Sequence, residues 1–129
     1  MKTMPKKATA ILLSISLLFV CSIAVYAYEV DRVSSTIDGF YCNGTLWTIT
    51  SKSMGATTYT STTLSNIETN TTTIRVRSGG YDPVEVTNGP YVSNEVDATA
   101  SIGGDIGSAT GTHEIIFKTC DPFLCDTFY

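Results

Sequence analysis

Basic residues are scarce outside the first 27 positions of the sequence. Three of the eight Lys and Arg residues lie in that segment, which leaves five against twelve Asp and Glu and a net charge of −7 for residues 28–129. A protein that binds nucleic acid needs clustered cations to neutralise phosphates, and the only close basic pair is Arg75 and Arg77. These two residues alternate along a strand-like segment, which favours a solvated strand face. We therefore exclude nucleic acid as a partner.

The sequence also lacks the motifs of familiar catalytic and metal sites. It contains a single histidine, His113, and no nucleophile elbow, zinc-protease helix, phosphate loop or dinucleotide fingerprint. A zinc site needs four ligands at characteristic spacing, and neither a Cys-x-x-Cys pair nor a calcium-binding EF-hand loop occurs. His113 lies in phase with Ile115 and Phe117, which indicates a buried structural imidazole. We predict a protein that is not an enzyme, with no catalytic residues, no metal and no cofactor; a Cys–His pair is the enzymatic alternative.

Long apolar runs are confined to the N-terminus. Basic residues within the first seven positions precede an uncharged stretch over residues 8–26, and Val25 and Ala27 occupy the positions that signal peptidase recognises. The pattern predicts a signal peptide over residues 1–27, with Tyr28 as the first mature residue and a secreted product. The alternative is an uncleaved segment, which is long enough to contact a membrane as an anchor.

Cysteine is rare in the mature region. Cys21 leaves with the leader, and Cys42, Cys120 and Cys125 remain. An oxidising compartment allows one disulfide among these three. We expect it to join Cys42 to Cys120 or Cys125, because a long closed loop restricts the unfolded chain most. A Cys120–Cys125 bridge is the open alternative.

Helical periodicity is absent from residues 28–129, where β-branched residues are dense. Alternation is clearest over residues 92–102, where Val96, Ala98 and Ala100 share one face. A glycine-rich segment, residues 103–107, predicts a hairpin to a strand over residues 108–118. Further strands are expected over residues 30–37, 45–51, 56–64 and 71–77, and near residues 84–86.

Turn and core signals complete the prediction of an all-β fold. Asn88-Gly89 is a strong turn signal, and Pro90 after it indicates an edge strand or a strand start. Trp47 shares a face with Ile49 and is expected in the core. Two threonine-rich runs, residues 57–63 and 69–73, suggest polar strand surfaces. The expected domain, residues 28–129, is a single small antiparallel β-sandwich of about seven strands.

Function is the least constrained property of this sequence. We expect an extracellular binding or surface-assembly module whose partner is a protein or a glycan, because aromatic side chains suit both kinds of contact. A secreted bacteriocin-like or effector protein that acts on other cells is the alternative, although its acidity opposes attraction to anionic membranes. Asn43 and Asn70 begin glycosylation sequons. The candidate contact residues are Tyr41, Tyr59, Tyr81 and Tyr91.

Overall fold

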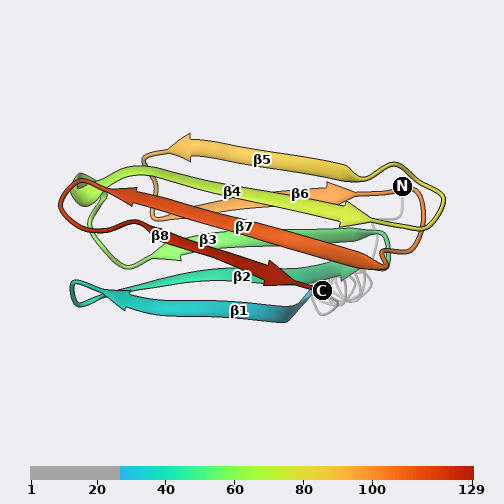
Figure 1. Ribbon diagram of the computed structural model, residues 1–129, viewed down its shortest axis with the longest axis horizontal. Coiled ribbons are helices and arrows are strands. Elements are labelled where there is room, and N and C mark those ends of the chain that lie inside the picture. Colours follow the sequence, from blue (N-terminus) through green and yellow to red (C-terminus); the bar gives the residue numbers. More distant parts are fainter. Residues whose placement is uncertain (1–26) are drawn as a thin grey trace, which may run out of the picture.

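The computed structural model describes residues 27–129, which form eight strands in two four-stranded antiparallel sheets. Sheet A has the order β1-β2-β3-β6 and sheet B the order β5-β4-β7-β8, and the two sheets lie face to face (Figure 1). The predicted signal peptide lies outside the described residues except for Ala27. Within residues 27–129, no helix is long and apolar enough to cross a membrane. The elements are β1 (Tyr28–Ile37), β2 (Phe40–Thr50), β3 (Ser53–Thr60), a short 3-10 helix η1 (Leu64–Asn66), β4 (Ile67–Arg77), β5 (Val84–Tyr91), β6 (Glu95–Ser101), β7 (Ser108–Phe117) and β8 (Phe123–Phe128).

The all-β, two-sheet prediction is confirmed, with eight strands in place of about seven. The strand that the sequence did not reveal is β8, which follows the Asp121-Pro122 turn and pairs with β7. Its inward residues, Phe123 and Thr127, are buried, whereas Leu124 between them is exposed. This short alternation was the available signal for a strand.

The predicted hairpin between β6 and β7 is wrong. β6 pairs with β3 in sheet A, and β7 pairs with β4 and β8 in sheet B, so residues 103–107 carry the chain from one sheet to the other. Ile102 and Ile106 are both buried, and their backbone N–H groups donate to the carbonyls of the β2–β3 turn at 2.9 and 2.8 Å. Burial of these two isoleucines across the end of the sandwich stabilises the crossing.

The Asn88-Gly89 turn prediction is also wrong, because both residues lie inside β5. Gly89 takes a φ of +101°, which glycine adopts without steric cost, and the β4–β5 register shifts at this point. The pair therefore forms a bulge in a strand that continues to Tyr91. Pro90 lies in an edge strand, as expected, since β5 pairs with β4 alone.

Trp47 does not enter the core, contrary to prediction. The buried inner row of β2 contains Cys42, Gly44 and Leu46, so alternation places Trp47 on the outer face of sheet A. There its ring covers Gly55, where an added Cβ would lie 2.3 Å from the indole. The space over Gly55 accommodates a half-buried indole outside the core.

The core consists of two apolar clusters separated by a band of buried polar residues, here called the polar belt. The larger cluster surrounds Leu46, Met54 and Ile74, and the smaller surrounds Ile67, Ile115 and Phe117. Thr58, Thr60 and Thr72 belong to the two threonine-rich runs, but their side chains point inward and are buried. The predicted polar surface is therefore formed only by the threonines that point outward. The belt consists of Thr58, Thr60, Asn70, Thr72, His113 and Thr127, each fully buried.

His113 lies on the inner face of β7, as predicted, and connects three strands. Its Nδ1 lies 2.8 Å from Thr58 Oγ1, and its Nε2 lies 2.9 Å from Thr127 Oγ1. Burial lowers the pKa of His113 to about 4, against a smaller opposing effect of nearby carboxylates. The imidazole is therefore neutral at pH 7.

One arrangement of protons satisfies the hydrogen bonds that link His113, Thr58, Thr72 and Thr127, whereas Asn70 Oδ1 in the belt has no partner among the described residues. Thr72 Oγ1 lies 2.7 Å from the Val96 carbonyl and 2.6 Å from Thr58 Oγ1. A hydroxyl has one proton and a carbonyl can only accept, so Thr72 donates to Val96 and Thr58 donates to Thr72. Nδ1 of His113 must then donate to Thr58, and Thr127 donates to Nε2. The geometry thus selects the Nδ1–H tautomer.

The three described cysteines are free thiols, so the expected disulfide is not formed in this structure. Cys42 is fully buried on β2, and its Sγ lies 3.4 Å from Thr60 Oγ1, to which it donates. Cys120 and Cys125 are partly buried beside the smaller cluster. Burial raises the pKa of all three thiols, that of Cys125 to about 11.

Candidate binding surface

The outer face of sheet A gathers aromatic and hydrogen-bonding side chains on a regular surface. The inner row of β2 points into the core, so Tyr41, Asn43, Thr45 and Trp47 point outward. The neighbouring strands extend these positions into rows across the sheet. One such row consists of Arg32, Thr45, Thr57 and Asp97, which are Cα partners across β1, β2, β3 and β6.

Trp47 is held in place by a chain of hydrogen bonds across three strands. Its indole N–H donates to Thr57 Oγ1 at 3.1 Å, and the Thr57 hydroxyl donates to Asp97 Oδ1 at 2.7 Å. The indole orientation is thereby fixed on the surface. Separately, Asn88 Nδ2 on β5 of sheet B donates to the backbone carbonyl of Asp97 at 2.6 Å and links β6 to the other sheet.

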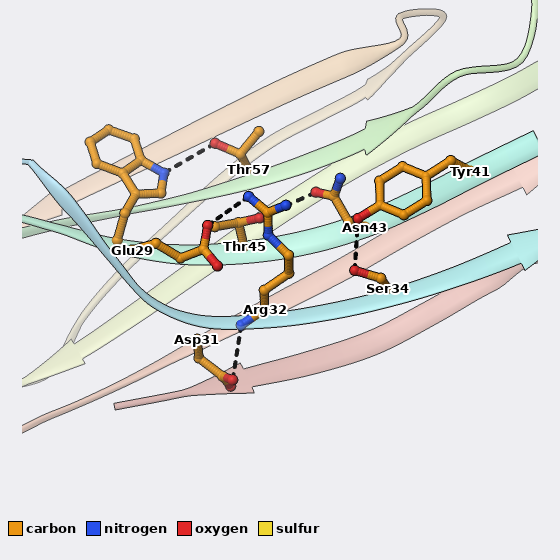
Figure 2. Close-up of polar contacts among 9 residues, drawn as sticks. Glu29, Asp31, Arg32, Ser34, Tyr41, Asn43, Thr45 and Thr57 are labelled. Atoms are coloured by element: carbon orange, nitrogen blue, oxygen red, sulfur yellow. Dashed lines mark hydrogen bonds and ion pairs between the residues drawn. The ribbon is translucent and has the colours of Figure 1, made fainter.

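An ion pair on β1 lies over the same face. Arg32 Nη2 donates to Glu29 Oε2 at 2.6 Å, with both side chains nearly half exposed (Figure 2). The hydrogen bond that Arg32 donates to Glu29 favours the charged guanidinium and raises the pKa of Arg32. An exposed pair of this kind contributes little to stability. It does place a cation and an anion on the surface, where a ligand can reach them.

The opposite end of the face carries two tyrosines. The Tyr41 hydroxyl lies 2.8 Å from Ser34 Oγ, and this hydrogen bond lowers the pKa of the phenol (Figure 2). Tyr59 lies opposite Asn43 on β3 and is a diagonal neighbour of Tyr41. Thr45 Oγ1 donates to Asn43 Oδ1 at 3.2 Å, and this buried polar pair lies between Tyr41 and Trp47 on β2.

The four predicted contact tyrosines do not form one site. Tyr41 and Tyr59 lie together on sheet A, whereas Tyr81 lies in the β4–β5 loop and Tyr91 ends β5 in sheet B. The Tyr81 ring is close to Gly103 and Gly104, where an added Cβ would lie 2.5 and 2.7 Å from it. Sequence reasoning missed Trp47, Arg32 and Thr57 as members of this face, although the alternation of β2 was a usable signal for Trp47.

Both sequon asparagines are buried in the folded domain. Asn43 is 8% exposed, and Asn70 is fully buried in the polar belt, where its Nδ2 donates to the carbonyls of Thr58 and Ser93. Both side chains are thus held within the fold.

His113 and Cys125 are neighbours through Gly44. A Cβ added at Gly44 would lie 2.4 Å from the His113 ring and 2.8 Å from Cys125 Sγ. Burial lowers the pKa of the imidazole and raises that of the thiol, so both groups are neutral at pH 7. Nucleophilic catalysis by cysteine uses the thiolate, which this environment disfavours. Among the described residues, no three His, Cys, Asp or Glu side chains are grouped to hold a metal ion.

The adjacent edges of the two sheets are linked by Asp31. The β1–β2 register shifts between Glu29 and Asp31, and Asp31 Oδ2 accepts from the Phe128 backbone N–H at 2.8 Å. Asp31 Oδ1 accepts from the Arg32 N–H at 2.9 Å (Figure 2). Bulges and edge carboxylates oppose the addition of further strands.

Comparison of the chain with protein-family models, with curated proteins and with solved structures gives no match.

Proposed function

We propose that residues 28–129 form a secreted, non-enzymatic binding module that binds an uncharged, hydroxyl-rich chain, a neutral polysaccharide, on the outer face of sheet A. The observation that carries this proposal is the combination of Trp47 at one end of the face, Tyr41 and Tyr59 at the other, and the exposed hydrogen-bonding side chains of Arg32 and Glu29 on the neighbouring strand.

The length of the face supports an extended ligand. Trp47 and Tyr41 are six residues apart on β2, which corresponds to about 20 Å at ~3.3 Å per strand residue. Aromatic rings offer flat apolar faces for the C–H faces of sugar rings, and a ring with a polar tip also hydrogen-bonds. Asn43 and Thr45 between them are only 8% and 9% exposed, so the side chains that can meet the donor and acceptor groups of a polysaccharide are Arg32 and Glu29.

Charge and composition favour a neutral glycan over the other partners. The exposed large hydrophobic residues of the domain lie mostly elsewhere, with only Tyr41 on this face. Protein interfaces have a more apolar, charge-depleted centre than this face, which exposes the Arg32–Glu29 ion pair. Glu29, Glu95 and Asp97 outnumber Arg32 on the face, so an anionic polymer is repelled. The Asp31 bulge on β1 disfavours assembly by strand addition.

Affinity electrophoresis tests the proposal. The protein is run through gels that contain neutral glucans, mannans or xylans, with polygalacturonate as the anionic control. We expect retardation by at least one neutral polysaccharide and none by polygalacturonate. Trp47→Ala and Tyr41→Ala should each reduce retardation by about tenfold in affinity, since central aromatic contacts contribute most of the binding energy.

Tyr91→Ala supplies the matched control, because Tyr91 is an exposed tyrosine of sheet B. It should bind as the unmodified protein does. Urea unfolding of each variant establishes that the fold is retained. Migration unaffected by every neutral polysaccharide, or equal loss of binding in Tyr91→Ala, would contradict the assignment to sheet A.

A further inference from the structure

A separate cleft lies at the end of the sandwich where β1 begins and β8 ends, because Tyr28 and Tyr129 both line it. Its volume is about 420 Å³, within the ordinary range for small-molecule sites. The β2–β3 turn and the β6–β7 crossing form its walls. This cleft shares no residue with the polysaccharide-binding face and is independent of that proposal.

The inner end of the cleft carries an unpaired polar group. Thr48 is 8% exposed and lines the cleft, and its Oγ1 has no hydrogen-bond partner among the described residues. The fully buried hydroxyls of Thr58, Thr72 and Thr127 all have partners in the polar belt. A buried hydroxyl without a partner is unfavourable, so its presence at the cleft points to a ligand that supplies one.

The remaining lining has an apolar middle and an acidic rim. Met54 and Ile106 are buried, and the side chains of Tyr28 and Tyr129 border the cleft with rings that are more than half exposed. Asp105 is exposed at the rim. The lining drawn from the described residues includes no lysine, arginine or histidine. A carboxylate and two tyrosine rings attract a cation, and the net charge of −7 over residues 28–129 adds to that attraction.

We propose that this cleft binds a phenolic amine, a molecule with a hydroxyl on an aromatic ring and an ammonium group on a short chain. The ring lies between Met54 and Ile106, and its hydroxyl pairs with Thr48 Oγ1 at the inner end. The ammonium stays at the hydrated rim beside Asp105, because full burial of a charge is unfavourable.

Titrations with four small probes test the two polar contacts separately. The probes are tyramine and three analogues that each change one of its groups. Phenethylamine lacks the hydroxyl, 4-ethylphenol lacks the amine, and 3-(4-hydroxyphenyl)propionate carries a carboxylate in place of the amine. Protein produced from the full chain is titrated by NMR, with the methyl signal of Met54 as the reporter in the cleft. The indole signal of Trp47, on the outer face of sheet A, should remain unchanged.

Tyramine should bind most tightly, at a roughly millimolar dissociation constant for so small a ligand, and the propionate should not bind. Thr48→Val should weaken tyramine about tenfold and leave phenethylamine unchanged, because only tyramine offers a hydroxyl to Thr48. Asp105→Asn should weaken both amines and leave 4-ethylphenol unchanged. Thermal midpoints should not fall in Thr48→Val, since that variant removes an unpaired buried hydroxyl.

The control variants are Thr99→Val and Asp82→Asn, which make the same chemical changes outside the cleft lining. Both should bind tyramine as the unmodified protein does. Equal weakening of tyramine and phenethylamine by Thr48→Val, binding of the propionate as tightly as the amine, or an unchanged Met54 signal with every probe would overturn the proposal.

Discussion

Acidification should destabilise the domain through His113 before most carboxylates titrate. The pKa of this side chain is lowered by burial from 6.5 to about 4 in the folded state. Between these values the unfolded chain binds the proton and the folded protein does not, so stability is fully present above pH 6.5 and is lost as the pH falls toward 4. A shift of this size corresponds to about 3 kcal/mol at the lower pH.

The loss has a structural origin in the polar belt. Protonation would make Nε2 a donor toward Thr127, whose own proton would then need another acceptor inside the core. A domain of this size has a total stability of about 5–15 kcal/mol, so a loss of ~3 kcal/mol is readily measured.

Urea unfolding of the unmodified protein and of His113→Gln, followed by the fluorescence of Trp47 between pH 7 and 4, measures the effect. As the pH falls from 7 to 4, the unmodified protein should lose about 3 kcal/mol more unfolding free energy than His113→Gln does. Because both proteins share every carboxylate, the difference isolates His113. A difference that stays constant within ~0.5 kcal/mol would refute the reasoning, as would an NMR titration of His113 with a folded-state pKa near 6.5.

Three further predictions concern packing, protonation and maturation. Gly44→Ala should lower the unfolding free energy by about 2 kcal/mol in urea titrations, because the added Cβ would overlap the His113 ring. Gly79→Ala has open space around the added Cβ and should change the unfolding free energy by less than ~0.5 kcal/mol. Equal effects of the two substitutions would contradict the packing around Gly44. The ¹⁵N chemical shifts of His113 at pH 7 should report the Nδ1–H tautomer, and an Nε2–H pattern would be inconsistent with the belt. N-terminal sequencing of the exported product should begin at Tyr28, and a product that retains Met1 and pellets with membranes would show that the leader is kept.

The alternation of apolar and polar residues correctly predicted which side chains face the core in strands whose inward residues are all buried. Val96, Ala98 and Ala100 alternate with exposed residues on β6, and His113 lies in phase with Ile115 on β7, as expected. The same reasoning failed for Trp47, because the face that Trp47 shares with Ile49 points outward and the opposite row, with Leu46, is buried. A shift of one residue moves every side chain of a strand to the opposite face, and packing against the partner sheet determines which face is buried.

Strand pairing could not be predicted from turn signals alone. The five residues 103–107 suit a hairpin loop, but they also suffice to cross from sheet A to sheet B, and burial of Ile102 and Ile106 decides between the two. Asn88-Gly89 has the sequence of a hairpin turn but forms a bulge. Both structures need a residue with a positive φ, which Gly89 supplies.

The binding face depends on contacts between residues that are distant in sequence. Thr57 and Asp97 are forty residues apart and meet only because β3 pairs with β6. The tyrosines could be named as candidates, but their division between the two sheets follows from the strand order. The unpaired Thr48 hydroxyl has no sequence signature, because only the packed structure shows which buried hydroxyls lack partners.

The central claim is that a neutral polysaccharide binds across the outer face of sheet A, and Trp47 reports on it directly as the only tryptophan of the chain. In a fluorescence titration with neutral oligosaccharides of increasing length, we expect the Trp47 emission to shift to the blue and saturate. The affinity should rise until the ligand spans the ~20 Å between Trp47 and Tyr41. Oligosaccharide binding, measured independently by calorimetry, that leaves the Trp47 emission unchanged would contradict the account.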